Sequence, residues 1–375
     1  MFFFIPVAKS PAIISGVVSL IIWIFSGIAV RNIPILIKRT CFLPVVVLIV
    51  LIWVGLLNAD NINYELKYVK RSYYWLYVFA VASLPFVRFD AEVLLKAFLG
   101  GLTLTAITSI TQYLGLAPMR AHGLPMGMLS GFHHIILSLF LVFGMLVLSF
   151  YFKQSSRKKE SLFIFCLMVI LFLDLSIVVY GRSGYAAFFL LSPIIVYNLF
   201  GKKNLLVILV LASILMVLFL TSPTVQERIK SAKKDITEYK SGNTNTSLGM
   251  RLDMWRMASK LFLEEPLTGA GSSGFKLTWE NNKPYPDSIS FQTPHSTFLY
   301  VAAGYGLPGI ITIVWMMTVL FRSGWHNKNS VIGFSVLSFA LVFFVGSLVN
   351  TMILGSANTA WASVFIGLQG ALKKR

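Results

Sequence analysis

Side chains able to do chemistry cluster in and beside one polar segment of an otherwise apolar chain. Residues 222–294 form this segment, between apolar runs of membrane-spanning length at 204–221 and 296–321. His295 lies where the chain returns to an apolar run, Arg251 lies inside the segment, and Arg182 lies in a short Gly-Arg-Ser-Gly hairpin upstream. Large loops on a rigid scaffold often carry binding and catalytic residues, so the pattern indicates chemistry at a membrane surface.

His295 is the strongest candidate for proton transfer, because an imidazole accepts a proton near neutral pH. It follows Pro294 and precedes Ser296 at the start of a span. The alternative is that it is a polar cap at the membrane interface. His133 and His134 open another span on the same side; their position is typical of interfacial anchors, with a secondary role at the site as the alternative.

Arg182 and Arg251 are candidates for binding phosphate, because a guanidinium contacts an oxyanion through two parallel hydrogen bonds. Arg182 could instead be a snorkelling anchor. Arg251, with Arg256 nearby, could instead belong to a solvated helix face. Asp174 is an acid inside an apolar span two helical turns before Arg182, and such carboxylates are either functional or paired structurally.

The composition indicates an all-α polytopic membrane protein. Hydrophobic residues make up 57% of the chain, charged residues 12%, and mean hydropathy is +0.77, whereas soluble domains carry about 25% charged residues. About 11–12 transmembrane helices are expected. The eleven expected spans are 12–30, 41–57, 73–88, 91–114, 132–152, 161–180, 184–200, 204–221, 296–321, 330–346 and 350–370. Residues 1–7 could be the remnant of a twelfth.

The net charge of +18 does not indicate nucleic-acid binding, because the basic residues cluster in short loops between spans. Short cytoplasmic loops carry an excess of Lys and Arg, so these basic loops are expected in the cytoplasm. With the basic loops inside, the segments 58–72, 115–131, 181–183 and 222–294 are expected on the outer face. We therefore predict an N-terminal transmembrane bundle over 1–221, one large periplasmic loop over 222–294, and C-terminal transmembrane helices over 295–375. The two cysteines imply no disulfide framework.

The large loop has a readable internal organisation. Residues 226–239 predict a polar surface helix, and 251–262 an amphipathic helix capped by Asn245, Thr246 or Ser247. The apolar face of the second helix comprises Leu252, Trp255, Ala258 and Phe262, and we expect that face to lie down in the membrane interface. Pro266 ends the helix. The Gly-rich run 268–274 that follows, with Gly271 and Gly274, is a backbone able to approach a ligand closely.

The sequence lacks metal-ligand spacings and nucleotide-binding glycine motifs, so we expect no metal and no cofactor. Chemistry outside the membrane, away from cytoplasmic nucleotides, suggests a donor that is already activated and anchored in the membrane lipids.

Several of these motifs together resemble the O-antigen ligase and polymerase superfamily. They are Arg-x-x-x-Trp-x-x-Ala at 251–258, Pro266, Gly269, Gly271, Gly274-Phe275, Pro294-His295-Ser296, Gly304-x-Gly306-x-x-Gly309 and the hairpin 181–184. The resemblance implies a GT-C-like membrane glycosyltransferase in the bacterial inner membrane, with its site facing the periplasm. Such an enzyme transfers a glycan from undecaprenyl diphosphate, with inversion and without metal, to a sugar hydroxyl of lipid A–core.

By the same resemblance, His295 matches the catalytic histidine, and Arg182 and Arg251 match the arginines that hold the diphosphate. Trp255, Arg256, Gly271 and Gly274 are secondary candidates. The chain departs from the family at Ser296, where asparagine is usual. The first hypothesis is that the protein is an O-antigen ligase. An O-antigen polymerase or a protein O-oligosaccharyltransferase differs only in acceptor, and a lipid or sugar transporter is the alternative of another class.

Overall fold

The protein is helical in every part that its structure describes. The computed structural model describes residues 1–84, 88–118, 134–179, 181–201, 210, 213, 217, 219–283 and 290–372, with the backbone alone at 88–90, 224 and 228. No strand occurs in these ranges. The prediction of an all-α polytopic membrane protein is confirmed.

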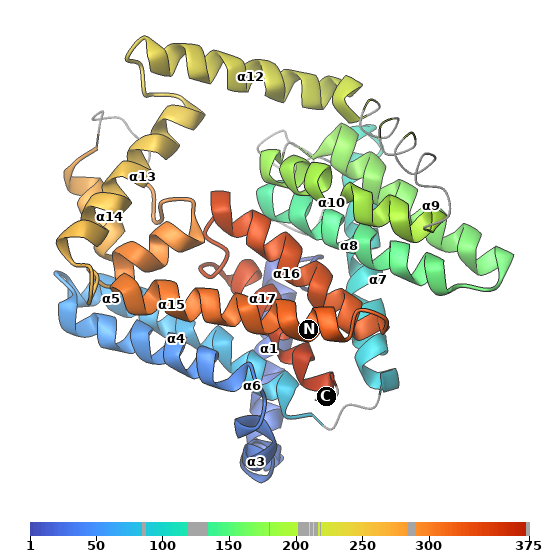
Figure 1. Ribbon diagram of the computed structural model, residues 1–375, viewed down its shortest axis with the longest axis horizontal. Helices are drawn as coiled ribbons and strands as arrows, with labels where there is room; N and C mark the ends of the chain where they lie inside the picture. Colours follow the sequence, from blue (N-terminus) through green and yellow to red (C-terminus); the bar gives the residue numbers. More distant parts are fainter. Residues whose placement is uncertain are drawn as a thin grey trace.

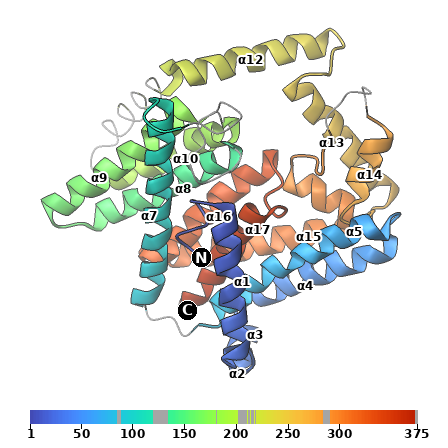
Figure 2. The same cartoon turned by 180° about the vertical axis from the view of Figure 1, so that it is seen from behind.

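The N-terminal half contains the helices α1 to α10. Their bounds are α1 Lys9–Phe25, α2 Ile28–Arg31, α3 Ile33–Ile37, α4 Phe42–Val54, α5 Ile62–Val69, α6 Leu76–Ala82, α7 Arg88–Tyr113, α8 His134–Gln154, α9 Lys158–Leu173 and α10 Arg182–Phe200. Short 3-10 turns follow α4 at Gly55–Asn58 and α5 at Lys70–Trp75, and a π-helical turn, Asp174–Val178, extends α9. In Figure 2, α1 and α7 are steep, whereas α4 and α15 run roughly across the view.

The C-terminal half contains the loop helices and three more helices of the bundle. The loop helices are α12 Pro223–Lys240, α13 Ser247–Glu264 and α14 Gly274–Asn281, and the bundle is completed by α15 Thr297–His326, α16 Val331–Val349 and α17 Ser356–Leu368. A 3-10 turn, Gln369–Ala371, follows α17. In Figure 1, α12 lies across the top of the molecule, and α13 descends from it towards α14 and α15.

Six helices in the described ranges are long and apolar enough to cross a membrane: Ala91–Tyr113, His134–Gln154, Lys158–Val178, Arg182–Phe200, Thr297–His326 and Val331–Val349. Each matches an expected span. The expected span 12–30 is shorter as a helix, because Gly27 adopts a left-handed φ of 70° after α1. Within the expected span 73–88, α6 ends at Ala82 and α7 begins at Arg88, and in 350–370 the helix begins at Ser356. Most of 204–221, with Lys202 and Lys203, lies outside the described residues.

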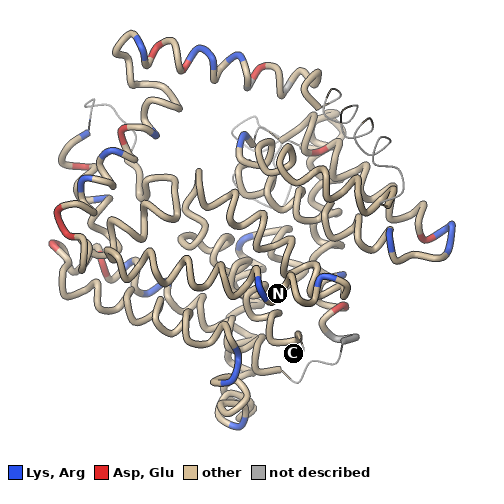
Figure 3. Tube along the Cα trace, in the orientation of Figure 1, with Lys and Arg blue, Asp and Glu red and all other residues tan. Residues whose placement is uncertain are grey.

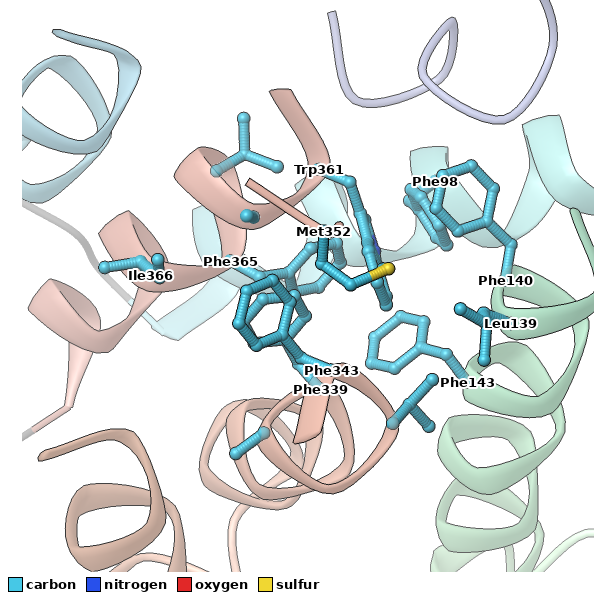
Figure 4. Close-up of a cluster of buried hydrophobic side chains, with 14 of the residues drawn as sticks. Phe98, Leu139, Phe140, Phe143, Phe339, Phe343, Met352, Trp361, Phe365 and Ile366 are labelled. Atoms are coloured by element: carbon cyan, nitrogen blue, oxygen red, sulfur yellow. The ribbon is translucent and has the colours of Figure 1, made fainter. Parts of the chain in front are cut away.

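An aromatic cluster holds the bundle together. Trp361 of α17 is fully buried between Phe140 of α8, at 4.9 Å between ring centroids, and Phe339 of α16, at 4.8 Å. Figure 4 shows these rings with Phe98, Phe143 and Phe365. Phe365 meets Phe98 and Phe143 edge-on and stacks on Phe339. Edge-to-face pairs of this kind add about 0.5–1.5 kcal/mol each beyond the area they bury. The cluster fixes α17 against α8 and α16, and with it the segment that precedes α17.

The loop helices form largely as predicted. The polar helix α12 covers 226–239 and carries alternating basic and acidic residues (Figure 3). Thr246 caps α13 by accepting a hydrogen bond from the Gly249 amide at 3.1 Å. The helix ends at Glu264, two residues before Pro266.

The apolar face expected on α13 is mostly not the face that packs on protein. The buried residues are Met250, Met254, Ala258 and Leu261, which pack on α14 and α15, while Leu252, Trp255 and Phe262 are only half-buried. Apolar side chains surround most of this helix, so periodicity alone does not show which of them meet protein. The placement of α13 in a membrane interface stays a prediction.

Candidate functional site

Arg182 is the first residue of α10, after the connection from α9, and α10 packs on α8. Its neighbours Gly181 and Gly184 touch Ser138 of α8 so closely that any side chain would clash there. This close approach fixes the start of α10 and therefore the base of the Arg182 side chain. The guanidinium reaches α12: Nη2 donates to Ser231 Oγ at 2.9 Å, and Nη1 lies 3.3 Å from Asp235 Oδ2.

Arg251, in the first turns of α13, lies close enough to this pair to share its electrostatics. Burial lowers the pKa of the Arg251 guanidinium, the positive charge of Arg182 lowers it further, and the carboxylate of Asp235 raises it. The structure thus brings together two arginines that are 69 positions apart in the chain (251 − 182). One carboxylate lies within electrostatic range of two guanidinium groups, which leaves a net positive charge suited to an anion.

His295 has an unusual backbone. Its φ is 52°, and no other residue except glycine has a positive φ in the described ranges. Left-handed conformations of this kind are costly and concentrate at functional sites. The next residue explains how the chain is held there: Ser296 caps α15 by accepting from the Leu299 amide at 3.4 Å, and it donates to the Ser347 carbonyl at 3.4 Å. Ser296, which stands where the family usually has asparagine, therefore caps α15.

The His295 side chain lies against Phe291, with ring centroids 5.5 Å apart, and lines a cavity of about 240 Å³. The rest of the lining comes from the start of α8, from the chain just before His295, and from the segment between α16 and α17. The polar side chains around it are Arg71, Gln292, Thr293, Asn350, Thr351 and Asn358. We refer to this space as the His295 cavity.

The His295 cavity and the arginine pair are neighbours in the hydrogen-bond network, but neither arginine of the pair lines the cavity. Asn350, in the cavity wall, donates to Ser183 Oγ at 2.8 Å, next to Arg182. Its carbonyl accepts from Thr297 Oγ1 at 3.0 Å, two residues after His295. Asn350 therefore ties the Arg182 hairpin to the beginning of α15.

The Gly-rich turn is in close contact with α15. Ala270 and Gly271 donate backbone hydrogen bonds to Ala303 and Gly304 of α15 at 2.9 and 3.0 Å. Gly271 has a φ of 77° and lies against Gly55, and Gly274 begins α14. These glycines therefore allow the turn to lie close to α15 and to Gly55 of the same chain.

Glu65 anchors the turn from the other side. Its side chain is fully buried, and it accepts hydrogen bonds from the Ser272 amide at 2.6 Å and the Ser273 amide at 2.7 Å. Two backbone donors satisfy a buried carboxylate in the way that an anion is held at a turn. The Gly-rich turn is therefore a fixed part of the fold in this structure.

The secondary candidates are scattered. Arg256 is exposed on α13, and Trp255 is half-buried beside it. His134 is half-buried at the start of α8, and His133 lies outside the described residues. Asp174 is fully buried in the π-helical turn, near Ser109 of α7. Nothing brings Asp174 into the His295 cavity.

Sequence analysis overlooked several residues of the site. Arg71 was included only within the segment 58–72 expected on the outer face, and Glu65, Asn350 and Asn358 were not singled out. A signal was available for the last two, since amides are unusual in an otherwise apolar terminal segment. In the described residues no three His, Cys, Asp or Glu side chains gather as metal ligands do. The expectation of metal-free, cofactor-free chemistry stays a prediction.

Comparison with known proteins agrees with the resemblance noted from the motifs. Residues 167–314 match the family described as O-Antigen ligase. An uncharacterized protein of Haemophilus influenzae is 27% identical over 179 residues, 45% of this chain and 45% of that protein. The O-antigen ligase of Escherichia coli K12 is 27% identical over 150 residues, 38% of this chain and 34% of that protein. The chain thus matches less than half the length of either relative. The similarity to the O-antigen ligase superfamily is confirmed.

Proposed function

From this similarity and from the geometry of the site, we propose that the chain is a membrane glycosyltransferase of the O-antigen ligase type. It transfers a glycan from undecaprenyl diphosphate to a sugar hydroxyl of lipid A–core, at the periplasmic face of the bacterial inner membrane. The observation that carries the proposal is that Arg251 lies within electrostatic range of both Arg182 and Asp235, which form an ion pair. Two guanidinium groups beside a single carboxylate retain capacity for a further anion of high charge.

The arginine pair acts on the leaving group. When the glycosidic bond to the diphosphate breaks, negative charge develops on the departing oxygen. Fixed, partly buried guanidinium groups interact with that charge more strongly in the transition state than in the ground state, and such differential binding is what accelerates a reaction. Because burial already weakens the hydration of Arg251, a bound diphosphate gains more from it than from an exposed lysine or arginine.

His295 takes the proton. The acceptor oxygen attacks the anomeric carbon from the side opposite the diphosphate. The new carbon–oxygen bond forms as the carbon–oxygen bond to phosphate breaks, and the hydroxyl proton passes to the imidazole. The configuration at carbon inverts. A correctly placed general base contributes roughly 10²–10⁴ in rate, and the cap at Ser296 and the contact with Phe291 hold the imidazole at the cavity.

The test is surface-polysaccharide analysis of a strain that lacks this protein. An O-antigen ligase predicts unlinked, lipid-borne polymer and unmodified lipid A–core, with full restoration by the wild-type chain. Single repeat units on the core would instead indicate a polymerase. Unchanged polysaccharide together with lost transport of a lipid or sugar would contradict the proposal and favour a transporter.

A further inference from the structure

Arg71 has no role in the reaction proposed above. It is exposed at the start of the 3-10 turn Lys70–Trp75, and it lines the His295 cavity. It also lines the narrow adjoining pocket formed by Tyr68, Tyr300 and Tyr305. Arg71 is therefore the arginine that shares a cavity with His295.

Arg71 is available for a ligand. Its contact in the described chain is with the ring of Tyr68, 5.8 Å from the centroid, and no described carboxylate lies within ion-pair distance of it. Arg182, by contrast, is engaged by Asp235. An arginine that stacks on a buried tyrosine keeps its hydrogen-bond donors free and its position defined.

The cavity wall gives a second, independent indication of a missing polar ligand. Asn350, Thr351 and Asn358 line it and are each more than nine-tenths buried. One oxygen of each, Oδ1 of the two asparagines and Oγ1 of the threonine, has no hydrogen-bond partner in the described residues. Buried polar atoms without partners are uncommon and call for an explanation, of which a ligand or ordered water is one.

The cavity is of limited size. Its volume of about 240 Å³ lies below the roughly 300–1,000 Å³ of pockets that enclose a drug-sized ligand. It therefore suits one sugar ring with its phosphate and not a length of polymer. Ile135, Ile136 and Leu354 give it apolar walls, while Arg71 contributes a positive charge.

We propose that Arg71 contacts the substrate: its guanidinium binds a phosphate group carried next to the reacting sugar, opposite His295 in the same cavity. The inference rests on the proposed function and names a residue of that site. The phosphate belongs either to the donor diphosphate or to a phosphorylated acceptor sugar. The chemistry at Arg71 is the same in both cases, a bidentate charge-assisted contact.

The experiment measures transfer by purified wild type, Arg71→Gln and Arg71→Lys in nanodiscs, with donor and acceptor varied in turn. Hydrogen bonds to charged groups contribute about 1.5–3 kcal/mol, so Arg71→Gln should raise the KM of the phosphate-bearing substrate roughly 10- to 100-fold. A rise in donor KM assigns the phosphate to the donor, and a rise in acceptor KM assigns it to the acceptor. Arg71→Lys should recover part of the loss, because lysine keeps the positive charge but cannot form the two parallel hydrogen bonds of a guanidinium.

Lys70→Gln is the matched control, since Lys70 is exposed, adjacent and basic but does not line the cavity. It should leave both KM values unchanged, and a thermal melt of each variant reports any structural loss. Unchanged KM values in Arg71→Gln, or equal effects of Lys70→Gln, would overturn the inference.

Direct binding separates this inference from the proposed function. The probe is inorganic diphosphate, and its binding is measured by calorimetry on wild type, Arg71→Gln and Lys70→Gln. Weaker binding by Arg71→Gln than by Lys70→Gln supports Arg71 even if wild type transfers nothing to lipid A–core, which would refute the ligase alone. Equal binding by wild type and Arg71→Gln would refute the role of Arg71 while leaving the ligase intact.

Discussion

Arg182 and Asp235 form an ion pair across 53 positions of the chain, with Nη1 3.3 Å from Oδ2. The pair joins the start of α10 to the loop helix α12, and Arg251 lies within electrostatic range of both charges. A diphosphate that binds the two arginines must therefore compete with a resident carboxylate.

This competition predicts that Asp235→Asn binds diphosphate more tightly than wild type. Ion pairs of this exposure contribute about 0.2–1 kcal/mol, so the dissociation constant for inorganic diphosphate should fall up to about 5-fold at low salt. The gain should shrink as ionic strength rises. Glu238→Gln is the control, because Glu238 lies on the same helix and pairs with Lys234. Weaker binding by Asp235→Asn would mean that the carboxylate positions Arg182 for the ligand.

Replacing both arginines should be no worse than replacing one. If Arg182 and Arg251 hold a single diphosphate, each alanine variant nearly abolishes transfer, and the double variant resembles the worse single one, because residues that act as a unit are non-additive. Arg182→Lys and Arg251→Lys should rescue only part of the rate. Arg256→Lys, at an exposed position of the same helix, should behave as wild type. Full activity of both lysine variants would favour a snorkelling anchor.

His295 offers a way to separate its side chain from its backbone. Asparagine and glycine tolerate a left-handed φ better than alanine does. His295→Asn and His295→Gly should therefore fold as stably as wild type or more so, while His295→Ala should be slightly destabilised. All three should lose transfer by roughly 10²-fold or more, because none supplies a base. His134→Ala should retain most activity. Transfer rates that follow thermal stability across the series would show that His295 is structural.

The sequence predicts the parts of this fold that depend on local chemistry. The polar helix after residue 222, the cap at Thr246 and the stop before Pro266 are all read from neighbouring residues and are all present. The apolar lengths likewise predict the six long helices. Arg182 and Arg251 were predicted as phosphate-binding residues from their chemistry and their position near the membrane surface, and the family resemblance assigned both to one diphosphate.

What the sequence could not provide is the set of contacts between distant segments. The Arg182–Asp235 ion pair, the cavity that Arg71 shares with His295, and the Asn350–Ser183 hydrogen bond each depend on packing among segments far apart in the chain. The left-handed φ of His295 has no sequence signal either, because histidine seldom adopts it. The Gly-rich turn was read as a ligand-binding backbone, since glycine permits close approach to protein and ligand alike.

Glu65 should be important for stability. Its carboxylate is fully buried and accepts from the amides of Ser272 and Ser273. Glu65→Gln replaces one acceptor oxygen with a donor group that faces an amide donor, so it should destabilise the fold by about 1–3 kcal/mol in thermal or denaturant unfolding in detergent. Glu264→Gln, at an exposed position with only a Lys260 pair, should change stability by less than about 0.5 kcal/mol. Equal stability of the two variants would show that the turn does not depend on the carboxylate.

Gly306 should not tolerate a side chain, because α15 bends there against the loop. Its φ is 62°, and an added Cβ would lie 2.5 Å from the Pro266 carbonyl oxygen. Gly306→Ala therefore combines a left-handed backbone, which costs about 1–2 kcal/mol for a residue with a Cβ, with a clash that separates the Gly-rich turn from α15. We expect a lower melting temperature and weaker transfer, since α15 also begins at the His295 cavity.

Gly100→Ala is the matched control: Gly100 lies within α7 with open space around it, so alanine should stabilise that helix by roughly 0.5–1 kcal/mol. A Gly306→Ala protein as stable as wild type would show that the loop is not fixed on α15 in the way that the backbone hydrogen bonds indicate.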